Sequence, residues 1–465
     1  MYTYLLRKAK KDYYSSLDPS KITDNKFFWK VVKPLFSEKT VTTNNITLVE
    51  TDHIFQDEKI VAEKFNSFFG DAVKNLNIEI NCNLLSNDLN TDDPILNAIS
   101  KYKNHPSILK IIEFHGTENE SFSFENTTFE TVYNEIMSLN LSKASPKDSL
   151  PAKIIKDNCD IFAQKLYIDF NASIKSGTYP NNMKLADITP SYKKGDHTNK
   201  ENYRPVSILP ALSKIYERLI FNQMYGFIES KLSNDQCGFR KGYSAQYCLI
   251  NLIEKWRASA DNNCSSGVLL TDLSKAFDCL IHDLLIAKLN AYGFDNNSLL
   301  LIHNYLAQRY QRVRVNSNYS SWSEIINGVP QGSILGPVLF NIYLSDLFLF
   351  TTDSEIVNYA DDISPYACKE DIGSVINQLE SDSQTLIEWV TNNALKANPN
   401  KFHLITNSCD DNISIKVDQF RIDNSKSENL LGMNLKFDEH VTSLYKKASQ
   451  KLHALARVSR FMNIE

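Results

Sequence analysis

Residues 358–363 read Asn-Tyr-Ala-Asp-Asp-Ile, and this short stretch decides how the rest of the chain is interpreted. We predict a β-hairpin with Asp361 and Asp362 at its tip. Neighbouring side chains on one strand point to opposite faces, so only a tight turn lets both carboxylates approach one site. Two such groups repel each other unless cations neutralise them, which makes the pair a candidate metal site. Taken alone, the pair is also what an exposed acidic turn would show.

A second acidic stretch occupies residues 267–278, Gly-Val-Leu-Leu-Thr-Asp-Leu-Ser-Lys-Ala-Phe-Asp. Its compact apolar run predicts a buried β-strand, followed by a helix over residues 282–289. Asp272 then stands at the end of the strand, where a carboxylate can face a cleft. Three carboxylates on two adjacent strands can hold two Mg²⁺ ions about 3.5–4 Å apart for phosphoryl transfer. The alternative for Asp272 alone is a helix N-cap.

Between these stretches lie residues 327–341, Asn-Gly-Val-Pro-Gln-Gly-Ser-Ile-Leu-Gly-Pro-Val-Leu-Phe-Asn. They carry three of only 14 glycines in the chain. Such clustering predicts a backbone that turns sharply and lets another group approach closely, ahead of an apolar helix over residues 338–347. A purely structural turn would have the same composition.

Together the three stretches resemble the motifs of reverse transcriptases. Their residues are similar to the same motifs in the non-LTR, LINE-type retrotransposon polymerases of the jockey-like group. The resemblance is continuous from about residue 142 onward. It implies an α+β right-hand polymerase fold, with fingers, an antiparallel palm sheet backed by helices, and a helical thumb. It also implies RNA-directed DNA synthesis, in which a primer 3′-hydroxyl attacks a deoxynucleoside triphosphate. The cofactor would be two Mg²⁺ ions, with Mn²⁺ as a substitute, held by Asp272, Asp361 and Asp362.

Residues 188–196 and 202–209 predict a strand, a loop and a second strand. Similar polymerases use a hairpin of this kind to hold the incoming triphosphate, which needs converging cations, with Arg preferred for bidentate phosphate contacts. We assign this role to Arg204, with Lys193 and Lys194 beside it. A solvent-facing basic turn is the alternative.

The resemblance assigns roles to further residues. Phe277 would pack under the sugar and exclude a 2′-hydroxyl, although a core aromatic would look identical in sequence. Gln331 would contact the nucleotide, and Lys401 would act as a general acid toward the leaving pyrophosphate unless it is a plain surface lysine. Arg240, between glycines in residues 236–244, would contact the template. Gly432 lies in residues 429–435, which resemble the primer-grip hairpin.

Composition sets outer limits on these interpretations. A chain of 465 residues with 42% hydrophobic and 11% aromatic residues is typical of a globular protein with two or three subdomains. The net charge of −5 does not by itself indicate a nucleic-acid binder, but a local basic surface matters more. Eight cysteines without a C-x-x-C pair argue against a zinc ribbon or a disulfide framework. We expect an intracellular protein of the cytoplasm, the nucleus or both, with no signal peptide, transmembrane segment or membrane partner.

Five segments are predicted along the chain. They are a basic helical arm (1–40), a partly irregular N-terminal extension (41–141), fingers with the start of the palm (142–265), the palm with the catalytic carboxylates (266–410), and the primer-grip hairpin with the start of a truncated thumb (411–465). Helices are expected over residues 61–69, over 126–140 with Thr127 or Thr128 as cap, and over 441–462. In the family that this chain resembles, an endonuclease domain precedes such a basic arm, and no such domain is recognisable here. The expected partners are therefore an RNA template, a DNA primer, deoxynucleoside triphosphates and an endonuclease supplied elsewhere.

Two other functions remain open on sequence grounds. The first is an inactive retrotransposon remnant that keeps the fold and only binds nucleic acid, which would fit the missing flanking domains. The second is a template-independent nucleotidyltransferase, which also uses three acids but does not need the stretches around Arg204 and Arg240.

Overall fold

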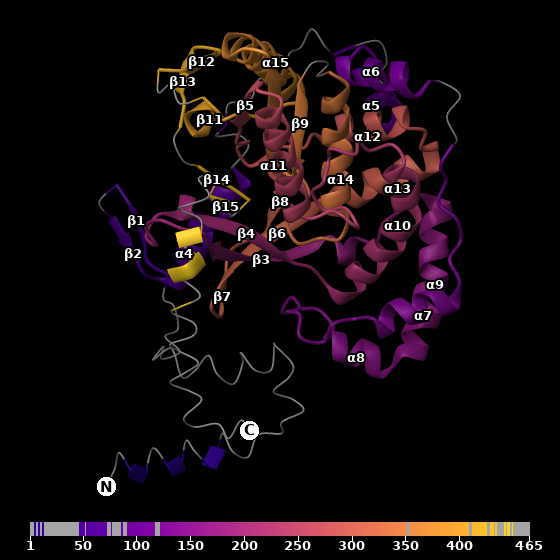
Figure 1. Cartoon of the computed structure of the whole chain (residues 1–465). Helices are drawn as coiled ribbons and strands as arrows, with labels where there is room; N and C mark the ends of the chain where they lie inside the picture. The colour runs from indigo at the N-terminus through magenta and orange to yellow at the C-terminus, as the bar shows by residue number, and fades with distance from the viewer. Residues whose placement is uncertain are drawn as a thin grey trace. The chain divides into compact units, whose positions relative to one another are not determined.

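The computed structural model describes residues 46–51, 53–71, 76, 85–86, 91–116, 121–350, 354–408, 412–425, 428–431 and 433–434, with a few residues near each end (4–5, 8–9, 12–13, 441–442, 444–446 and 449). Figure 1 draws the other residues as a thin grey trace. Contacts divide the chain into two units, residues 46–425 and the two ends, 1–45 with 426–465. All parts of the site described below belong to residues 46–425.

In the unit formed by the chain ends, β14 (Asn429–Leu430) and β15 (Met433–Asn434) pair as a short antiparallel hairpin. A hairpin is therefore present where the primer grip was expected. The residue assigned to that grip, Gly432, lies outside the described residues. The same holds for most of the basic arm (1–40) and most of the helix expected over residues 441–462.

A four-stranded antiparallel sheet lies at the centre of the larger unit. Its order is β11 (His403–Thr406), β5 (Ser265–Leu270), β10 (Asp362–Lys369) and β9 (Glu355–Tyr359). Val268 in β5 is paired with Tyr366 of β10 on one side and Ile405 of β11 on the other. Because β9 and β10 are joined by a two-residue turn and β10 is antiparallel to β5, the end of β5 and this turn lie at the same edge of the sheet.

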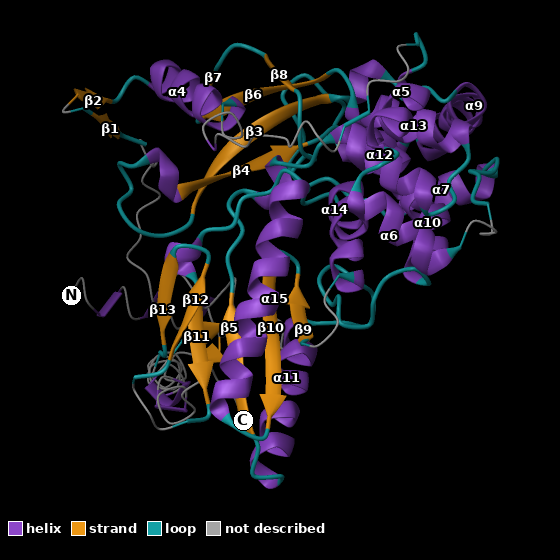
Figure 2. Cartoon of the chain, turned by 90° about the horizontal axis from the view of Figure 1, so that it is seen from above, coloured by secondary structure: helices purple, strands orange, loops and turns teal. Residues whose placement is uncertain are grey.

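Helices cover both faces of this sheet, as Figure 2 shows for α15 (Ile372–Asn392) in front and α11 (Ala245–Asp261) behind. A Cβ atom on Gly267 of β5 would lie 3.1 Å from Val375 of α15. On the other face, the Tyr366 hydroxyl donates a hydrogen bond to the Lys255 carbonyl of α11 at 3.1 Å. Helix α15 begins after Asp371, whose side chain caps it. Its buried positions recur at helical spacing: Val375, Leu379, Leu386, Trp389 and Val390.

A second sheet is built around the predicted strand-loop-strand segment. β3 (Leu185–Tyr192) and β4 (Tyr203–Ile208) form an antiparallel hairpin, which confirms that prediction. β3 also pairs in parallel with β6 (Arg309–Val315), to which β7 (Asn318–Tyr319) and β8 (Ser323–Ile325) are antiparallel. Helix α4 (Glu58–Gly70) packs on this sheet, with Val61 and Phe65 in one core cluster with Ile188 and Val313. A short hairpin, β1 (Leu48–Glu50) with β2 (His53–Phe55), precedes α4.

A helical body stands beside the two sheets (Figure 1). It consists of α5 (Pro94–Tyr102), α6 (Pro106–His115), α7 (Phe129–Met137), α8 (Ala152–Asp157), α9 (Cys159–Ser176), α10 (Ala211–Glu229), α12 (His282–Ala291), α13 (Asn296–Leu306) and α14 (Leu335–Leu344). Short 3₁₀ turns lie at Asn181–Met183, Lys200–Asn202, Ala276–Asp278, Ser345–Leu349 and Pro399–Lys401. A further two-stranded sheet joins β12 (Ser414–Val417) to β13 (Phe420–Asp423).

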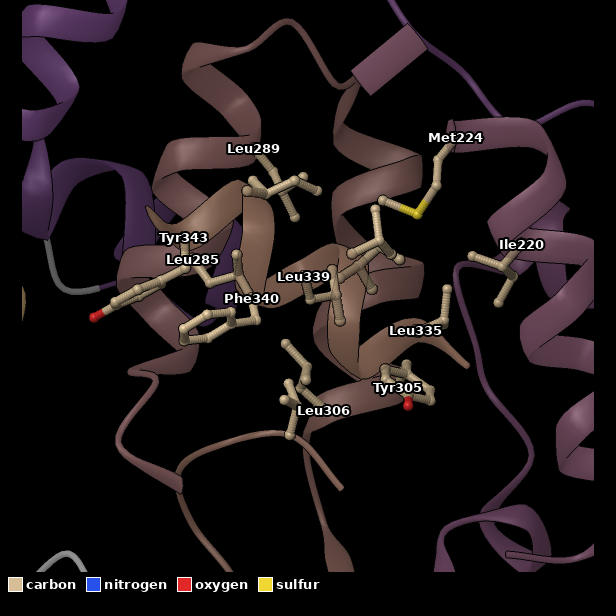
Figure 3. Close-up of a cluster of buried hydrophobic side chains, with 14 of the residues drawn as sticks. Ile220, Met224, Leu285, Leu289, Tyr305, Leu306, Leu335, Leu339, Phe340 and Tyr343 are labelled. Carbon is tan, nitrogen blue, oxygen red and sulfur yellow. The ribbon is translucent and has the colours of Figure 1, made fainter. Parts of the chain in front are cut away.

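Helix α14 lies in the middle of this body. All of its residues except Pro337 are buried, as expected for a helix that is apolar on every side. Figure 3 shows Leu339 and Phe340 of α14 among side chains from α10, α12 and α13, including Met224, Leu289 and Leu306. The main core is thus assembled around the helix that directly follows the glycine-rich stretch.

The α+β class predicted from the sequence is confirmed. Helix α4 covers the helix expected over residues 61–69, and α7 is shorter than the expected 126–140. Thr128 caps α7 by accepting a hydrogen bond from the Thr131 N–H at 3.2 Å. Across the described part of the chain, no helix combines the length and the apolar character that a membrane crossing would need.

Candidate active site

The turn between β9 and β10 carries the adjacent carboxylates, and its shape is set by a buried amide. Ala360 has a left-handed backbone with φ of +58°. The Asn358 side chain, fully buried in β9, donates hydrogen bonds to the carbonyls of Ala360 (2.9 Å) and Asp362 (3.1 Å). A turn with both carbonyls held in this way has little freedom, so Asp361 and Asp362 are presented at a fixed edge of the sheet.

Asp272 is anchored next to this turn. Thr271 donates from both its N–H (3.2 Å) and its hydroxyl (2.6 Å) to the Ile363 carbonyl on β10. The Asp272 carbonyl accepts a hydrogen bond from the Asn398 N–H at 2.9 Å. Residues 273–275 are not helical, so the alternative of Asp272 as a helix N-cap is wrong. The end of β5 instead delivers Asp272 to the edge that carries Asp361 and Asp362.

A cavity of about 670 Å³ opens at this edge. All three carboxylates line it, together with most of the other residues proposed from the sequence, namely Lys193, Arg204, Phe277, Gln331 and Lys401. Lys194 follows Lys193 in the same turn and is exposed, but it does not line the cavity. Segments that are more than 200 residues apart in the chain therefore meet around one hollow, which is lined by the three acids and by cations that include Lys193 and Arg204 of the β3–β4 hairpin.

The charges around the cavity act on one another. Burial raises the pKa of Asp362 to about 6, helped by the negative charges of Asp361 and Asp272 and opposed by Lys193 and Arg204. Burial also lowers the pKa of Lys193, and the neighbouring charge of Arg204 lowers it further. Lys401 Nζ lies 2.9 Å from Asp272 Oδ2. The carboxylates and the cations thus share one electrostatic environment.

Whether this donor set suits a metal ion can be judged from its chemistry. Among the described residues, no group of three or more His, Cys, Asp or Glu side chains lies close enough to hold an ion as it stands. Asp272 is instead paired with Lys401. The pKa of Asp362 is nevertheless raised, first by burial and then by the charges of Asp361 and Asp272, so the three carboxylates act on one another, and carboxylate oxygens are preferred ligands of Mg²⁺. The three residues fit a divalent cation once Asp272 exchanges its lysine partner.

Phe277 is both a core side chain and a wall of the cavity. Its ring stacks on that of Phe340 in α14, with centroids 4.3 Å apart and planes inclined by 19°. It is only partly buried and lines the cavity beside the carboxylates. The stack on Phe340 confirms the core interpretation of Phe277, and because the ring also borders the cavity, its contact with the sugar stays a prediction.

Gln331 is held in place by two contacts. Its Nε2 donates a hydrogen bond to Asp278 Oδ1 at 2.9 Å, and its carbonyl accepts one from the Ser207 N–H of β4 at 2.8 Å. The adjacent Gly332 has φ of +116°, and a Cβ atom there would lie 2.8 Å from the Ser207 carbonyl. The close approach predicted for the glycine-rich stretch is therefore the approach of strand β4.

Arg240 does not reach the cavity. Its side chain is 3% exposed and forms an ion pair with Glu229, with 2.8 Å between Nη2 and Oε1. It also donates to the carbonyls of Ser233 and Gln236, the latter at 2.8 Å. A guanidinium held in this way is not free to contact a template strand. The residue predicted as a template contact is here a structural anchor of the loop that precedes α11.

Several residues of the site were not identified from the sequence. Asp278 holds Gln331, and burial raises its pKa to about 6. Its position directly after Phe277 was the available signal. Phe68 and Phe69 of α4 also line the cavity, and Lys275 Nζ lies 4.4 Å from the Phe68 ring centroid. Phe239, next to Arg240, lines the cavity as well. The glycines and basic residues on either side of Phe239 were a usable signal, but nothing local marks Phe68 and Phe69.

Comparison with known proteins agrees with this geometry. Residues 192–435 match the family described as reverse transcriptase (RNA-dependent DNA polymerase). The chain is 29% identical over 343 residues to the RNA-directed DNA polymerase from mobile element jockey of Drosophila melanogaster, covering 70% of this chain and 37% of that protein. It is 30% identical over 282 residues to the probable RNA-directed DNA polymerase from transposon BS of the same species, covering 58% and 31%.

More distant relatives share a smaller part of the chain. The retrovirus-related Pol polyprotein from type-1 retrotransposable element R2 of Popillia japonica is 28% identical over 160 residues, 33% of this chain and 22% of that protein. The chain spans about a third of the length of the jockey and BS proteins. The matched region contains all of the charged residues that line the cavity, from Lys193 to Lys401. This chain belongs to the reverse transcriptase (RNA-dependent DNA polymerase) family, and within that family to the enzymes of non-LTR retrotransposons.

Proposed function

We propose that this chain catalyses RNA-templated DNA synthesis, adding deoxynucleotides to a primer 3′-hydroxyl. The observation that carries the proposal is the composition of one cavity, in which three carboxylates from two strands face Lys193 and Arg204 from a separate hairpin. A triphosphate needs cations on its phosphates and a site where charge can be stabilised as the bond to the α-phosphate is exchanged.

In this proposal the architecture is that of a right hand. The four-stranded sheet with α11 and α15 corresponds to the palm, and the β3–β4 hairpin with its sheet corresponds to the fingers. The segment boundaries predicted from the sequence are retained as part of the proposal, with residues 429–435 as the primer grip. The thumb would follow that hairpin.

Each residue has a chemical task. Asp272, Asp361 and Asp362 would hold divalent cations, Mg²⁺ or Mn²⁺, which when bound stabilise the charge on the attacking and leaving oxygens. Arg204 and Lys193 would bind the phosphates, because a guanidinium and an ammonium on one wall complement their negative charge. Phe277 would border the sugar, and Gln331 would be kept in position by Asp278. Lys401 would donate a proton to the departing pyrophosphate.

The test is primer extension on poly(rA)·oligo(dT) with dTTP and Mg²⁺, using the whole chain. Synthesis that requires the template supports the proposal, and the same reaction without poly(rA) tests for a template-independent transferase. The Asp361→Asn variant controls for contaminating polymerase. Tight binding of the duplex without any extension would instead identify a protein that only binds nucleic acid.

A further inference from the structure

Glu217 of α10 is a fully buried acid that the proposed reaction does not use. It does not line the cavity of the carboxylates. Its Oε2 atom accepts hydrogen bonds from the backbone N–H groups of Ile334, at 2.6 Å, and Leu335, at 3.2 Å. Its Oε1 atom accepts one from the Ser213 hydroxyl at 3.0 Å. A side chain of α10 therefore holds the backbone of a segment more than a hundred residues farther along the chain.

These contacts place the Glu217 carboxylate at the start of α14. The helix begins after Ile334, whose own side chain makes no capping hydrogen bond. The first N–H groups of a helix have no partner within it, and its N-terminus favours a negative charge. The Ser333 hydroxyl accepts a hydrogen bond from the Gly336 N–H at 2.9 Å. Glu217 satisfies the two preceding N–H groups, so part of the cap of α14 comes from another helix.

Stability alone does not explain an acid at this position. Burial raises the pKa of the Glu217 carboxyl, and the positive charge of Arg309 in β6 is the largest of the effects that oppose this rise. Arg309 is also buried, and its Nη1 atom donates to the Tyr305 carbonyl at 2.9 Å. Leu335 and Tyr305 belong to the apolar core in which these charges lie (Figure 3). Opposite charges in a core often stabilise a fold no better than apolar side chains would, so the contacts of Glu217 point to a role in placing the segment that it holds.

The segment held by Glu217 directly follows Gln331. At its first end, the Gln331 side chain and carbonyl are each fixed by one hydrogen bond. At its second end, three residues later, the Ile334 N–H is fixed by Glu217. Gly332 lies between the two ends and, because it has no β-carbon, does little to resist rotation of the backbone. Loss of the second anchor would therefore let the first end turn, and with it the Gln331 side chain.

We propose that Glu217 is a positioning residue for the incoming nucleotide: its carboxylate anchors the start of α14 and thereby keeps Gln331 in the orientation that contacts the nucleotide. The role rests on the proposed polymerase function. It is not a catalytic role, because Glu217 does not line the cavity. Loss of the anchor should therefore lower kcat/KM for the nucleotide only as long as the Gln331 side chain is present.

Two conservative variants of the whole chain separate the reach of the side chain from its charge. Glu217→Asp keeps the negative charge near Arg309 but is one methylene shorter, so it falls short of the N–H groups of α14. Glu217→Gln keeps the length and an oxygen for those N–H groups but loses the charge. In extension on poly(rA)·oligo(dT), Glu217→Asp should lower kcat/KM for dTTP by about tenfold or more, since small displacements of positioning groups cause losses of this size. Glu217→Gln should stay within about threefold of the wild type, because its hydrogen bonds to the helix are retained.

A double-mutant cycle with Gln331→Ala tests whether the effect passes through Gln331. In that background, Glu217→Asp should lower kcat/KM by less than about a further twofold, because the effects of residues that act as one unit do not add. Amide hydrogen exchange should become faster in Glu217→Asp at the start of α14, while α11 keeps its protection. Asp382→Asn, which removes the charge of a buried acid on α15, is the matched control and should change neither result. Melting temperatures of all variants report on folding.

The outcomes separate this role from the function on which it rests. Equal kcat/KM values for Glu217→Asp and Glu217→Gln, or a loss that multiplies fully with that of Gln331→Ala, overturn the positioning role even where wild-type extension upholds the polymerase. An unchanged kcat/KM in Gln331→Ala also overturns it. If the wild type does not extend primers, the polymerase function fails and hydrogen exchange decides on the anchor. Faster exchange limited to the start of α14 in Glu217→Asp then upholds the anchor, and unchanged exchange overturns it.

Discussion

The Lys401 ammonium lies 2.9 Å from Asp272 Oδ2, so one of the three carboxylates at the cavity already faces a cation that the protein itself supplies. Both side chains are substantially exposed, at 60% and 37%. An ion pair in such a position contributes at most about 1 kcal/mol. Asp272 would therefore exchange Lys401 for a divalent ion at little cost, and the freed ammonium would remain at the cavity where the pyrophosphate would leave.

This pair predicts opposite effects of one substitution on metal binding and on rate. Lys401→Gln should lower the Mg²⁺ concentration for half-maximal extension up to about fivefold, because the competing ammonium is gone. The rate at saturating Mg²⁺ should fall by about 10²-fold or more, the usual contribution of a general acid. Single-turnover extension over a Mg²⁺ series measures both. Lys401→Arg, which keeps the charge, should restore the Mg²⁺ dependence, and an unchanged rate in Lys401→Gln would make Lys401 a plain surface lysine.

Asp361→Asn should reduce nucleotide incorporation by at least about 10²-fold, the scale for removing one preorganised electrostatic group. The fold should be unaffected, because Asp361 sits in a turn held by the Asn358 amide and not by its own side chain. Primer extension and the melting temperature are measured together. Asp261→Asn, an exposed carboxylate at the end of α11, is the matched control and should be neutral. Extension by Asp361→Asn at near the wild-type rate would reject the assignment of the three acids.

Asp362 should make stability depend on pH when no divalent ion is present. Its folded-state pKa of about 6 is above the ordinary value of 3.8. The protonated form is thus favoured by folding, and its contribution to stability is present at low pH and lost as the pH rises through about 6. After discounting for partial exposure, the wild type should gain about 1 kcal/mol relative to Asp362→Asn between pH 7.5 and pH 5.

The measurement is urea unfolding of the wild type and Asp362→Asn in EDTA at both pH values. Taking the difference between the two proteins removes the contributions of other titrating groups. Mg²⁺ at pH 7.5 should then stabilise the wild type more than the variant, because an ion that binds only the folded state adds to its stability. A pH-independent difference would mean that Asp362 is solvated like an ordinary surface acid.

Phe277→Val should raise the use of ribonucleotides relative to deoxynucleotides. The smaller side chain opens room for a 2′-hydroxyl at the cavity, and kcat/KM for rUTP and dTTP on poly(rA)·oligo(dT) measures the effect. Because the ring also stacks on Phe340, the variant should lose roughly 2–3 kcal/mol of stability, somewhat less than the usual Phe→Ala cost. Phe170→Leu, in the core of α9, controls for destabilisation alone. An equal change of the nucleotide ratio in both variants would return Phe277 to a purely structural role.

The amino-acid sequence by itself determined the local elements of the site. The tight turn at 358–363 and the strand ending at Asp272 follow from short-range rules, namely the alternation of side chains along a strand and the clustering of apolar residues before a polar turn. The hairpin that carries Lys193 and Arg204 was predictable for the same reason. What decides each of these elements lies within about ten residues.

Only the tertiary structure decided which of the candidate residues line the cavity and which are buried in contacts with other parts of the protein. Arg240 and Lys241 are adjacent and both basic, yet one is buried against Glu229 and the other is exposed. Asn341 of the distant helix α14 holds their loop through hydrogen bonds with Gln236 and Gly238. Phe68 and Phe69 line the cavity of the carboxylates because α4 packs on a sheet whose strands lie more than a hundred residues away in the chain. Such contacts depend on how whole elements bury their apolar faces, and the free energy of that burial is summed over the fold and is not recorded in any local pattern.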